Sequence, residues 1–111
     1  MKKKQKSSKT KKPTAQYDLG TIRNLIDQGN VRIRRNAEMS ALNDFGWGID
    51  DIKNAIKKLQ SRHFCKSADH HNRAGTVLDY YKARGIKTED IYTHFYIDDS
   101  GFLIISSFKR L

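Results

Sequence analysis

The sequence predicts a small α+β domain in which three N-terminal helices pack on a small, twisted, antiparallel β-sheet. Three observations support this fold class. Apolar residues recur at helical spacing in the first half of the chain, whereas the second half contains short runs rich in β-branched and aromatic residues. A turn signal separates the last two of these runs. The 111 residues leave room for one domain of this kind.

The first predicted helix begins after Asp18, whose carboxylate suits an N-cap, and ends at Gly29. Between these two residues the apolar positions recur at helical spacing, at Leu19, Ile22, Leu25 and Ile26. Val31 and Ile33 then form a short link to the next helix. One side of this first helix is therefore expected to face the core.

Two further helices are expected after the link. The second is predicted over residues 34–45, with Gly46 as its stop, and its inner face consists of Ala37, Ala41, Leu42 and Phe45. The third is predicted to be capped by Asp50, and its apolar stripe consists of Ile52, Ala55, Ile56 and Leu59. Both stripes are narrow, which indicates helices that are buried on one side only.

Strand signals dominate the second half of the chain. A short edge strand is predicted first, and three longer strands follow it, so that the strands cover residues 62–67, 77–82, 91–97 and 102–108. The segments between them are polar or contain glycine, which indicates loops over residues 68–76 and 83–90. Several consecutive strands without intervening helices favour an antiparallel sheet.

The last two strands are expected to form a hairpin with a defined register. A tight turn centred on Asp99 and Ser100 pairs Phe95 with Ile104, and the face that carries these two residues is almost wholly apolar. That face should point to the core. The opposite face then carries Tyr92, His94 and Tyr96, with Lys109 diagonally next to Tyr92.

The basic residues are concentrated at the N-terminus. The chain has 22 Lys and Arg against 12 Asp and Glu, a net charge of +10, yet residues 1–13 alone hold seven lysines and no acid. Without them the net charge is +3. We therefore divide the chain into a disordered basic tail over residues 1–13 and one domain over residues 14–111. The tail suits either a non-specific arm for RNA or a solubilising leader.

Composition excludes several function classes. No run approaches the roughly 18 apolar residues of a membrane span. Cys65 is the only cysteine, so no internal disulfide can form, and a cytoplasmic protein is expected. No glycine-rich nucleotide loop and no carboxylate pair for a metal is present, so no cofactor is predicted. A membrane protein, a secreted disulfide scaffold and a multidomain enzyme do not fit the chain.

A zinc site is a further alternative. His63 and Cys65, followed by His70 and His71, have a spacing that suggests zinc ligands. Against it, these residues straddle a predicted strand and lack a Cys-x-x-Cys knuckle, so we expect no metal site. In a regular strand Cys65 would point away from Lys66, as a buried thiol.

The tyrosine-bearing face of the hairpin suits RNA. Tyr92 and Tyr96 can stack on bases, and Lys109 can contact a phosphate. The alternative is a partly wetted sheet face, where tyrosine is common for structural reasons. Composition alone favours the partly solvent-exposed sheet face, because β-sheets readily accept tyrosine.

From Tyr17 to its C-terminus, the chain resembles the MqsR (motility quorum-sensing regulator) family of bacterial toxins. The resemblance rests on the order and spacing of short motifs, namely the Tyr-x-Leu-x-x-Ile-x-x-Leu-Ile-x-x-Gly-x-Val stretch from Tyr17 to Val31 with Ala37 after it, the Gly46 break, Asp51-Ile52, Leu59, Phe64-Cys65-Lys66-Ser67, Asp79-Tyr80-Tyr81, Ile91-Tyr92 and Ile105-Ser106-Ser107-Phe108-Lys109. It implies a RelE-like fold, metal-free cleavage of mRNA and neutralisation by a zinc-containing, DNA-binding antitoxin similar to MqsA.

The resemblance also implies catalytic roles for Lys66, Tyr92 and Lys109. Leu78 stands where a family glutamine precedes the Asp-x-Tyr element. We expect Lys66 and Lys109 to lie near each other and to stabilise charge, one of them also as an acid or base, while Tyr92 positions the phosphate. The alternative for Lys66 is a lysine that protects an edge strand from aggregation.

Substrate contacts are expected from five further side chains, His70, His71, Tyr81, His94 and Tyr96. For His70 and His71 the residues themselves favour the alternative of polar loop residues without a role. Trp47 fits either a core position or an antitoxin contact. The leading hypothesis is a metal-independent endoribonuclease toxin, an mRNA interferase. The rival is a non-catalytic RNA-binding module that uses the same basic and aromatic face, and Leu78 keeps this rival open.

Overall fold

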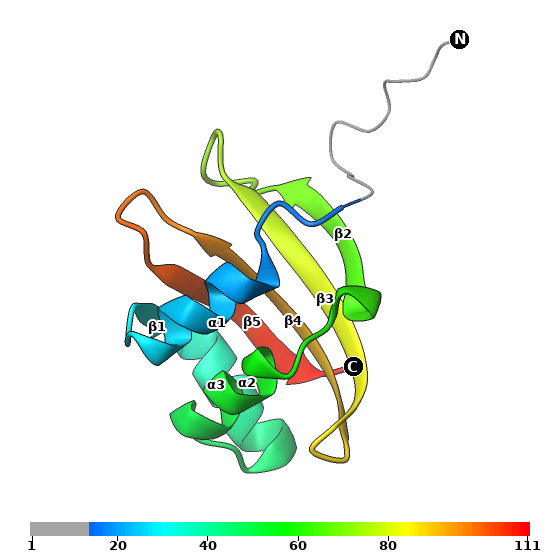
Figure 1. Ribbon diagram of the computed structural model, residues 1–111. Coiled ribbons are helices and arrows are strands. Elements are labelled where there is room, and N and C mark those ends of the chain that lie inside the picture. Colours follow the sequence, from blue (N-terminus) through cyan, green and yellow to red (C-terminus); the bar gives the residue numbers. More distant parts are fainter. Residues whose placement is uncertain (1–13) are drawn as a thin grey trace, which may run out of the picture.

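The computed structural model describes residues 14–111, which form an α+β domain with three helices and a five-stranded sheet (Figure 1). The helices are α1 (Leu19–Asp27), α2 (Arg35–Phe45) and α3 (Ile49–Lys57). The strands are β1 (Val31–Ile33), β2 (Phe64–Asp69), β3 (Val77–Ile86), β4 (Glu89–Ile97) and β5 (Leu103–Arg110), and a 3-10 turn, Ser61–His63, precedes β2. The tail predicted over residues 1–13 lies outside the described residues.

The sheet is mixed, which corrects the expectation of a purely antiparallel sheet. Its strand order is β1-β5-β4-β3-β2, and β1 pairs parallel to β5, with Arg32 opposite Ile104. The sequence suggested a link at Val31 and Ile33 because three residues are too few to show a strand period. These residues become a strand only when β5, some 70 positions later, supplies the hydrogen-bond partners. As predicted, β2 is an edge strand.

The helices cover one face of the sheet, and the opposite face, called the open face below, carries no helix (Figure 1).

The N-cap of α1 is confirmed, because the Thr21 amide donates to the Asp18 carboxylate over 3.1 Å. The predicted cap of α3 is wrong. Gly48 is the N-cap, and its amide donates to the Asp51 carboxylate over 3.1 Å, which leaves Asp50 without a capping role.

The apolar stripe of α2 is narrower than predicted. Ala37 and Ala41 are fully buried against the sheet, whereas Leu42 is 53% exposed. These alanines let the helix approach β5 closely, and Leu42 then lies on its outer side. The assignment of Leu42 to the core face is therefore wrong.

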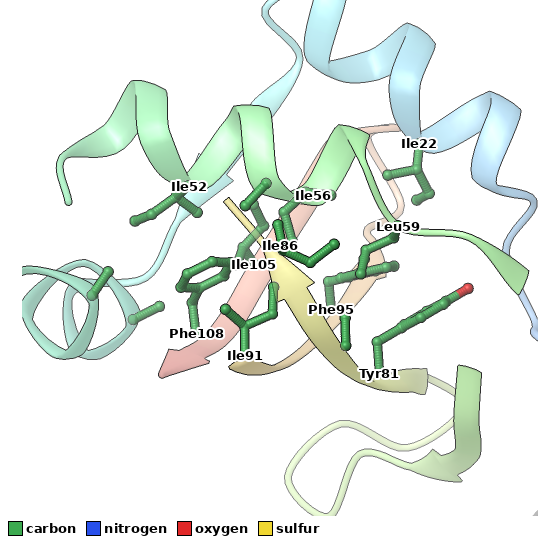
Figure 2. Packing of buried hydrophobic residues seen from close by; sticks show 14 of the residues in the cluster. Ile22, Ile52, Ile56, Leu59, Tyr81, Ile86, Ile91, Phe95, Ile105 and Phe108 are labelled. Atoms are coloured by element: carbon green, nitrogen blue, oxygen red, sulfur yellow. The ribbon is translucent and has the colours of Figure 1, made fainter. Parts of the chain in front are cut away.

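The helices and the sheet share one core (Figure 2). It combines side chains from all three helices with the inward residues of the three longest strands, and its largest fully buried members are Ile22, Ile52, Ile56, Leu59, Tyr81, Ile91, Phe95, Leu103, Ile105 and Phe108. No helix among residues 14–111 is long and apolar enough to cross a membrane.

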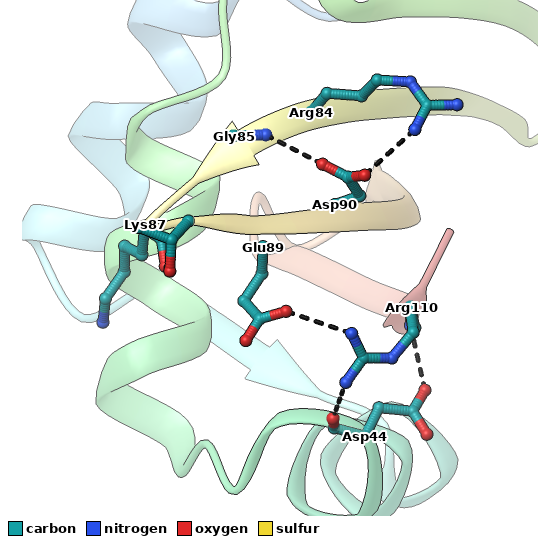
Figure 3. A network of polar contacts seen from close by, with 8 residues as sticks. Asp44, Arg84, Gly85, Lys87, Glu89, Asp90 and Arg110 are labelled. Atoms are coloured by element: carbon teal, nitrogen blue, oxygen red, sulfur yellow. Dashed lines mark hydrogen bonds and ion pairs between the residues drawn. The ribbon is translucent and has the colours of Figure 1, made fainter.

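Residues 83–90 are not the loop that the sequence suggested. β3 and β4 run on to a tight hairpin in which Lys87 and Thr88 both have positive φ, of 52° and 67°. The end of the hairpin is held by carboxylates (Figure 3): Asp90 accepts from the Gly85 amide and from Arg84, and Glu89 accepts from Arg110. Positive φ at non-glycine residues is uncommon, which is why the sequence did not reveal this turn.

The register of the β4–β5 hairpin differs from the predicted one at two points. The connection is a three-residue loop ending in Gly101, whose φ is 85°, so Ile97 pairs with Leu103 and Phe95 with Ile105. Ser106 is then an extra residue in β5, opposite the step from His94 to Phe95. The two shifts together restore the predicted face of Lys109 but place it directly opposite Tyr92 rather than diagonally.

Candidate active site on the open face

Two adjacent cross-strand rows of the open face bring the predicted catalytic residues together. One row runs Lys66, Tyr80, His94 and Ser107 through β2, β3, β4 and β5. The next row runs Lys82, Tyr92 and Lys109 through β3, β4 and β5. Because strand residues two apart share a face, these rows form one surface of cations and aromatic rings.

The two candidate lysines lie at opposite ends of this surface, which corrects the expectation that they are neighbours. Lys66 is on β2 and Lys109 on β5, so two strands separate them, about 14 Å at the backbone at normal strand spacing. Each ammonium group lies over a tyrosine ring: Lys66 Nζ is 4.9 Å from the centre of Tyr80, and Lys109 Nζ is 5.2 Å from the centre of Tyr92.

The two tyrosines and a histidine fill the space between the lysines. The ring centres of Tyr80 and Tyr92 are 6.4 Å apart, and that of His94 is 4.7 Å from Tyr80. The Tyr92 hydroxyl and His94 Nδ1 share a hydrogen bond of 3.2 Å, whose donor depends on the tautomer. No carboxylate among residues 14–111 forms an ion pair with Lys66, Lys82 or Lys109. The surface is thus open to an anion.

Burial adjusts the titration of these groups. It lowers the pKa of His94 to about 4, helped by the positive charges of His70 and Lys109. It also raises the pKa of Tyr80 and Tyr92, in the case of Tyr92 with a contribution from the Tyr80 charge. At neutral pH the shared hydrogen bond therefore joins an uncharged imidazole and a protonated phenol.

The lowered pKa of His94 predicts a loss of stability in acid. Unfolding restores its pKa to about 6.5. Between pH 6.5 and 4 the imidazole is therefore protonated in the unfolded chain but not in the folded chain. The free energy of unfolding should fall across that window by about 1–2 kcal/mol, a figure reduced for partial exposure to solvent. Urea titrations at several pH values measure it.

His94→Asn is the matched variant for this measurement, because it keeps a polar side chain that does not titrate. It should flatten the slope between pH 6.5 and 4 relative to the unsubstituted protein. An identical slope in both proteins would show that another group causes the acid sensitivity.

The structure divides the five predicted substrate contacts between the two faces. His94 and Tyr96 lie on the open face. The His70 ring packs edge-on against Tyr96 at 5.7 Å and stacks on His71 at 5.6 Å. Tyr96 is only 2% exposed, so the prediction that a base stacks on its ring is wrong. Tyr81 instead lies on the helix-covered face, 1% exposed and stacked on Phe95, and burial raises its pKa to about 12. A direct substrate contact by Tyr81 is therefore not compatible with this fold.

Cys65 is exposed, which corrects the prediction of a buried thiol. The register of β2 shifts between Phe64 and Lys66, so the regular alternation on which the prediction relied fails there. His63, Cys65 and the two loop histidines do not come together, and residues 14–111 contain no cluster of three or more side chains suited to a metal.

Trp47 is partly buried and packs on Phe45 and Phe108, with ring centres 4.7 and 6.0 Å away. This contact supports the core alternative for Trp47. Lys87 covers its remaining face, with Nζ 4.9 Å from the ring centre.

Two members of the site, Tyr80 and Lys82, were not singled out from the sequence. Tyr80 and Lys82 alternate with Tyr81 along the predicted strand, so they share one face and Tyr81 lies on the other. The predicted strand ended at residue 82, and the sequence did not show which of the two faces points to the core. Leu78 shares their face and joins a small apolar cluster with Tyr96 and Ile104. Leu78, at the position of the family glutamine, is thus a packing residue on the open face.

A pocket of about 700 Å³ lies away from this surface, beside the start of α1 and the 3-10 turn. Its two charged side chains already serve the fold. Asp18 caps α1, and Arg23 donates to the carbonyls of Lys57 and Leu59. The open face, with its unpaired lysines, is therefore the better candidate for a functional site.

Comparison with known proteins agrees with the sequence motifs. A search of curated proteins gave no match. The family model described as "Motility quorum-sensing regulator, toxin of MqsA" matches residues 14–110. That span covers every helix and strand of the domain and all the residues of the two rows. The chain therefore belongs to the motility quorum-sensing regulator family of toxins.

Proposed function

We propose that this toxin is an endoribonuclease, an mRNA interferase, and that the open face of its sheet is the active site. The observation that carries the proposal is the arrangement of Lys66 and Lys109 around the Tyr80, Tyr92 and His94 rings. Two unpaired cations can hold a phosphodiester between them, and the aromatic rings between them offer stacking surfaces for bases.

The reaction that suits these groups is internal transesterification. The ribose 2′-oxygen loses its proton and forms a bond to phosphorus, the bond from phosphorus to the 5′-oxygen breaks, and that oxygen takes up a proton. The products are a 2′,3′-cyclic phosphate and a 5′-hydroxyl. The transition state carries extra negative charge on the phosphate oxygens, which the ammonium groups of Lys66 and Lys109 stabilise.

The Tyr92–His94 pair is suited to positioning and proton transfer. At neutral pH His94 is unprotonated and can accept a proton, and a bound phosphate raises its pKa because an opposite charge favours the imidazolium. When His94 donates through Nδ1, the Tyr92 hydroxyl is free to donate to a phosphate oxygen. Either lysine can supply the proton that the 5′-oxygen needs.

The partner follows from the family. The family description names MqsA as the protein that its toxins pair with. We propose a cognate antitoxin similar to MqsA, zinc-containing and DNA-binding as the family resemblance implies, acting on a cytoplasmic toxin. Its binding should abolish RNA cleavage.

Cleavage of a long RNA by the purified protein in excess EDTA tests this function. We expect fragments with 2′,3′-cyclic phosphate and 5′-hydroxyl ends, because attack by the 2′-oxygen leaves these groups. Mapping the 5′ ends gives the preferred sequence. An RNA with 2′-O-methyl groups is the matched substrate, and it should bind but remain intact.

Two results would contradict the proposal. Fragments with 5′-phosphate ends would point to attack by water at the other side of the phosphate. Binding without cleavage, together with normal growth of cells that express the chain, would favour the RNA-binding module instead.

A further inference from the structure

Three arginines line a pocket of about 220 Å³ at the end of the open face nearest the β4–β5 turn. They come from three separate parts of the chain. Arg32 is on β1, Arg34 directly precedes α2, and Arg73 is in the segment between β2 and β3. Tyr96 and Ile104 contribute to the same pocket.

Aromatic side chains contact all three arginines. The Arg32 guanidinium lies 4.6 Å from the centre of the Phe102 ring. Arg73 lies 5.9 Å from the centre of Tyr96, and Arg34 donates to the Tyr96 hydroxyl over 3.4 Å. Stacking fixes a guanidinium while leaving its N–H groups available for an anion.

The pocket is lined by three arginines and one acid, Asp98, so it keeps a net positive charge. None of the three arginines forms an ion pair with a carboxylate of residues 14–111. Asp98 lines the pocket, but its Oδ1 accepts the amides of Ser100 and Phe102 and so serves the turn. Three cations against one acid, which is already hydrogen-bonded to the turn, indicate a site for an anionic ligand.

The pocket directly continues the proposed active site. Tyr96 follows His94 by two residues on β4, on the same face, which is about 7 Å along the strand. In the cross-strand direction, Tyr96 is opposite Ile104 and Ile104 is opposite Arg32. A ligand that leaves the lysine–tyrosine rows toward the turn therefore meets the arginines next.

We propose that Arg32, Arg34 and Arg73 bind a second backbone phosphate of the RNA, close to the phosphate that is cleaved. The proposal rests on the proposed function and adds a substrate subsite to it. An acidic segment of a protein partner is the competing ligand. Continuity with the aromatic surface favours RNA, because a nucleotide chain that stacks on Tyr92 must carry its next phosphates along the same face.

Equilibrium binding to a short, labelled 2′-O-methyl RNA tests the pocket, since this probe binds without being cleaved. Arg34→Gln and Arg73→Gln should each weaken binding about tenfold, and each should reduce the salt slope of log K by about 0.7. In cleavage assays on unmodified RNA, KM should rise while kcat stays within twofold. Arg35→Gln is the matched control, because Arg35 is exposed, adjacent in sequence and outside the pocket.

The outcomes separate this proposal from the proposed function. If the chain cleaves no RNA but Arg34→Gln still weakens binding to the probe, the pocket stands and the ribonuclease assignment falls. If cleavage occurs and both arginine variants bind the probe as Arg35→Gln does, the pocket proposal is overturned. It is overturned equally if the variants lose affinity for the antitoxin alone. Circular dichroism of each variant verifies the fold.

Discussion

Lys109→Ala and Lys66→Ala should each lower the rate of RNA cleavage about 10²–10³-fold, the usual effect of removing one electrostatic contact to a transition state. Each ammonium group faces a tyrosine ring and no carboxylate, so its charge is available to the phosphate. The fold should survive, because an exposed contact between a cation and a ring contributes only about 0.5–1 kcal/mol. Single-turnover cleavage of a long RNA measures the effect.

Two further variants sharpen this result. Lys109→Arg keeps the charge and should retain more activity than Lys109→Ala. Tyr92→Phe keeps the ring under Lys109 but removes the hydroxyl, and it should cost about 10–10² in rate if that hydroxyl positions the phosphate.

The control for lost charge is Lys58→Ala, because Lys58 is exposed at the end of α3, in the helix layer. It should cleave as the unsubstituted protein does. Rates within threefold of that protein for both Lys66→Ala and Lys109→Ala would refute the assignment of the open face as the active site.

Asp79→Ala should lower the free energy of unfolding by about 3 kcal/mol and Tm by about 15 °C. The Asp79 side chain is fully buried and accepts three hydrogen bonds, from the amides of Gln16 and Tyr17 over 3.0 and 2.9 Å and from the Ser67 hydroxyl over 2.5 Å. These hydrogen bonds connect the segment before α1 and the edge strand β2 to strand β3. Alanine removes the acceptor of all three hydrogen bonds.

Thermal unfolding followed by circular dichroism measures this effect, with two comparison variants. Asp79→Asn retains one acceptor oxygen and should fall between the alanine variant and the unsubstituted protein. Asp99→Ala removes an exposed carboxylate from the β4–β5 turn and should change the free energy of unfolding by less than about 0.5 kcal/mol. Equal Tm values for Asp79→Ala and Asp99→Ala would show that the Asp79 contacts contribute nothing net.

The elements that the sequence predicted well are those whose signals are local. Asp18, the apolar spacing of α1 and the glycine that follows it all act within a few residues of each other, so periodicity and capping sufficed. The same holds for β4, where strict alternation assigned Tyr92 and His94 to one face and Phe95 to the other.

The errors of the sequence-based prediction lie where one extra residue in a turn or strand moves the following side chains to the other face of the sheet. The three-residue turn ending in Gly101 and the extra residue Ser106 each shift the β5 register by one position. Either alone would have moved Lys109 to the core face, and together they cancel. A similar irregularity in β2 exposes Cys65. Such shifts depend on how neighbouring strands pack, and side-chain alternation within one strand does not reveal them.

The sequence by itself determined the α+β class, the order of the three helices and the four later strands, the family and the face on which Tyr92 and His94 lie, because each depends on local periodicity or on ordered motifs. Only the tertiary structure decided that β1 pairs parallel to β5, that Lys66 and Lys109 lie on opposite sides of two tyrosines, and that three arginines share one pocket. These features join residues far apart in the chain. Their positions follow from strand order and register, which the packing of the whole domain sets.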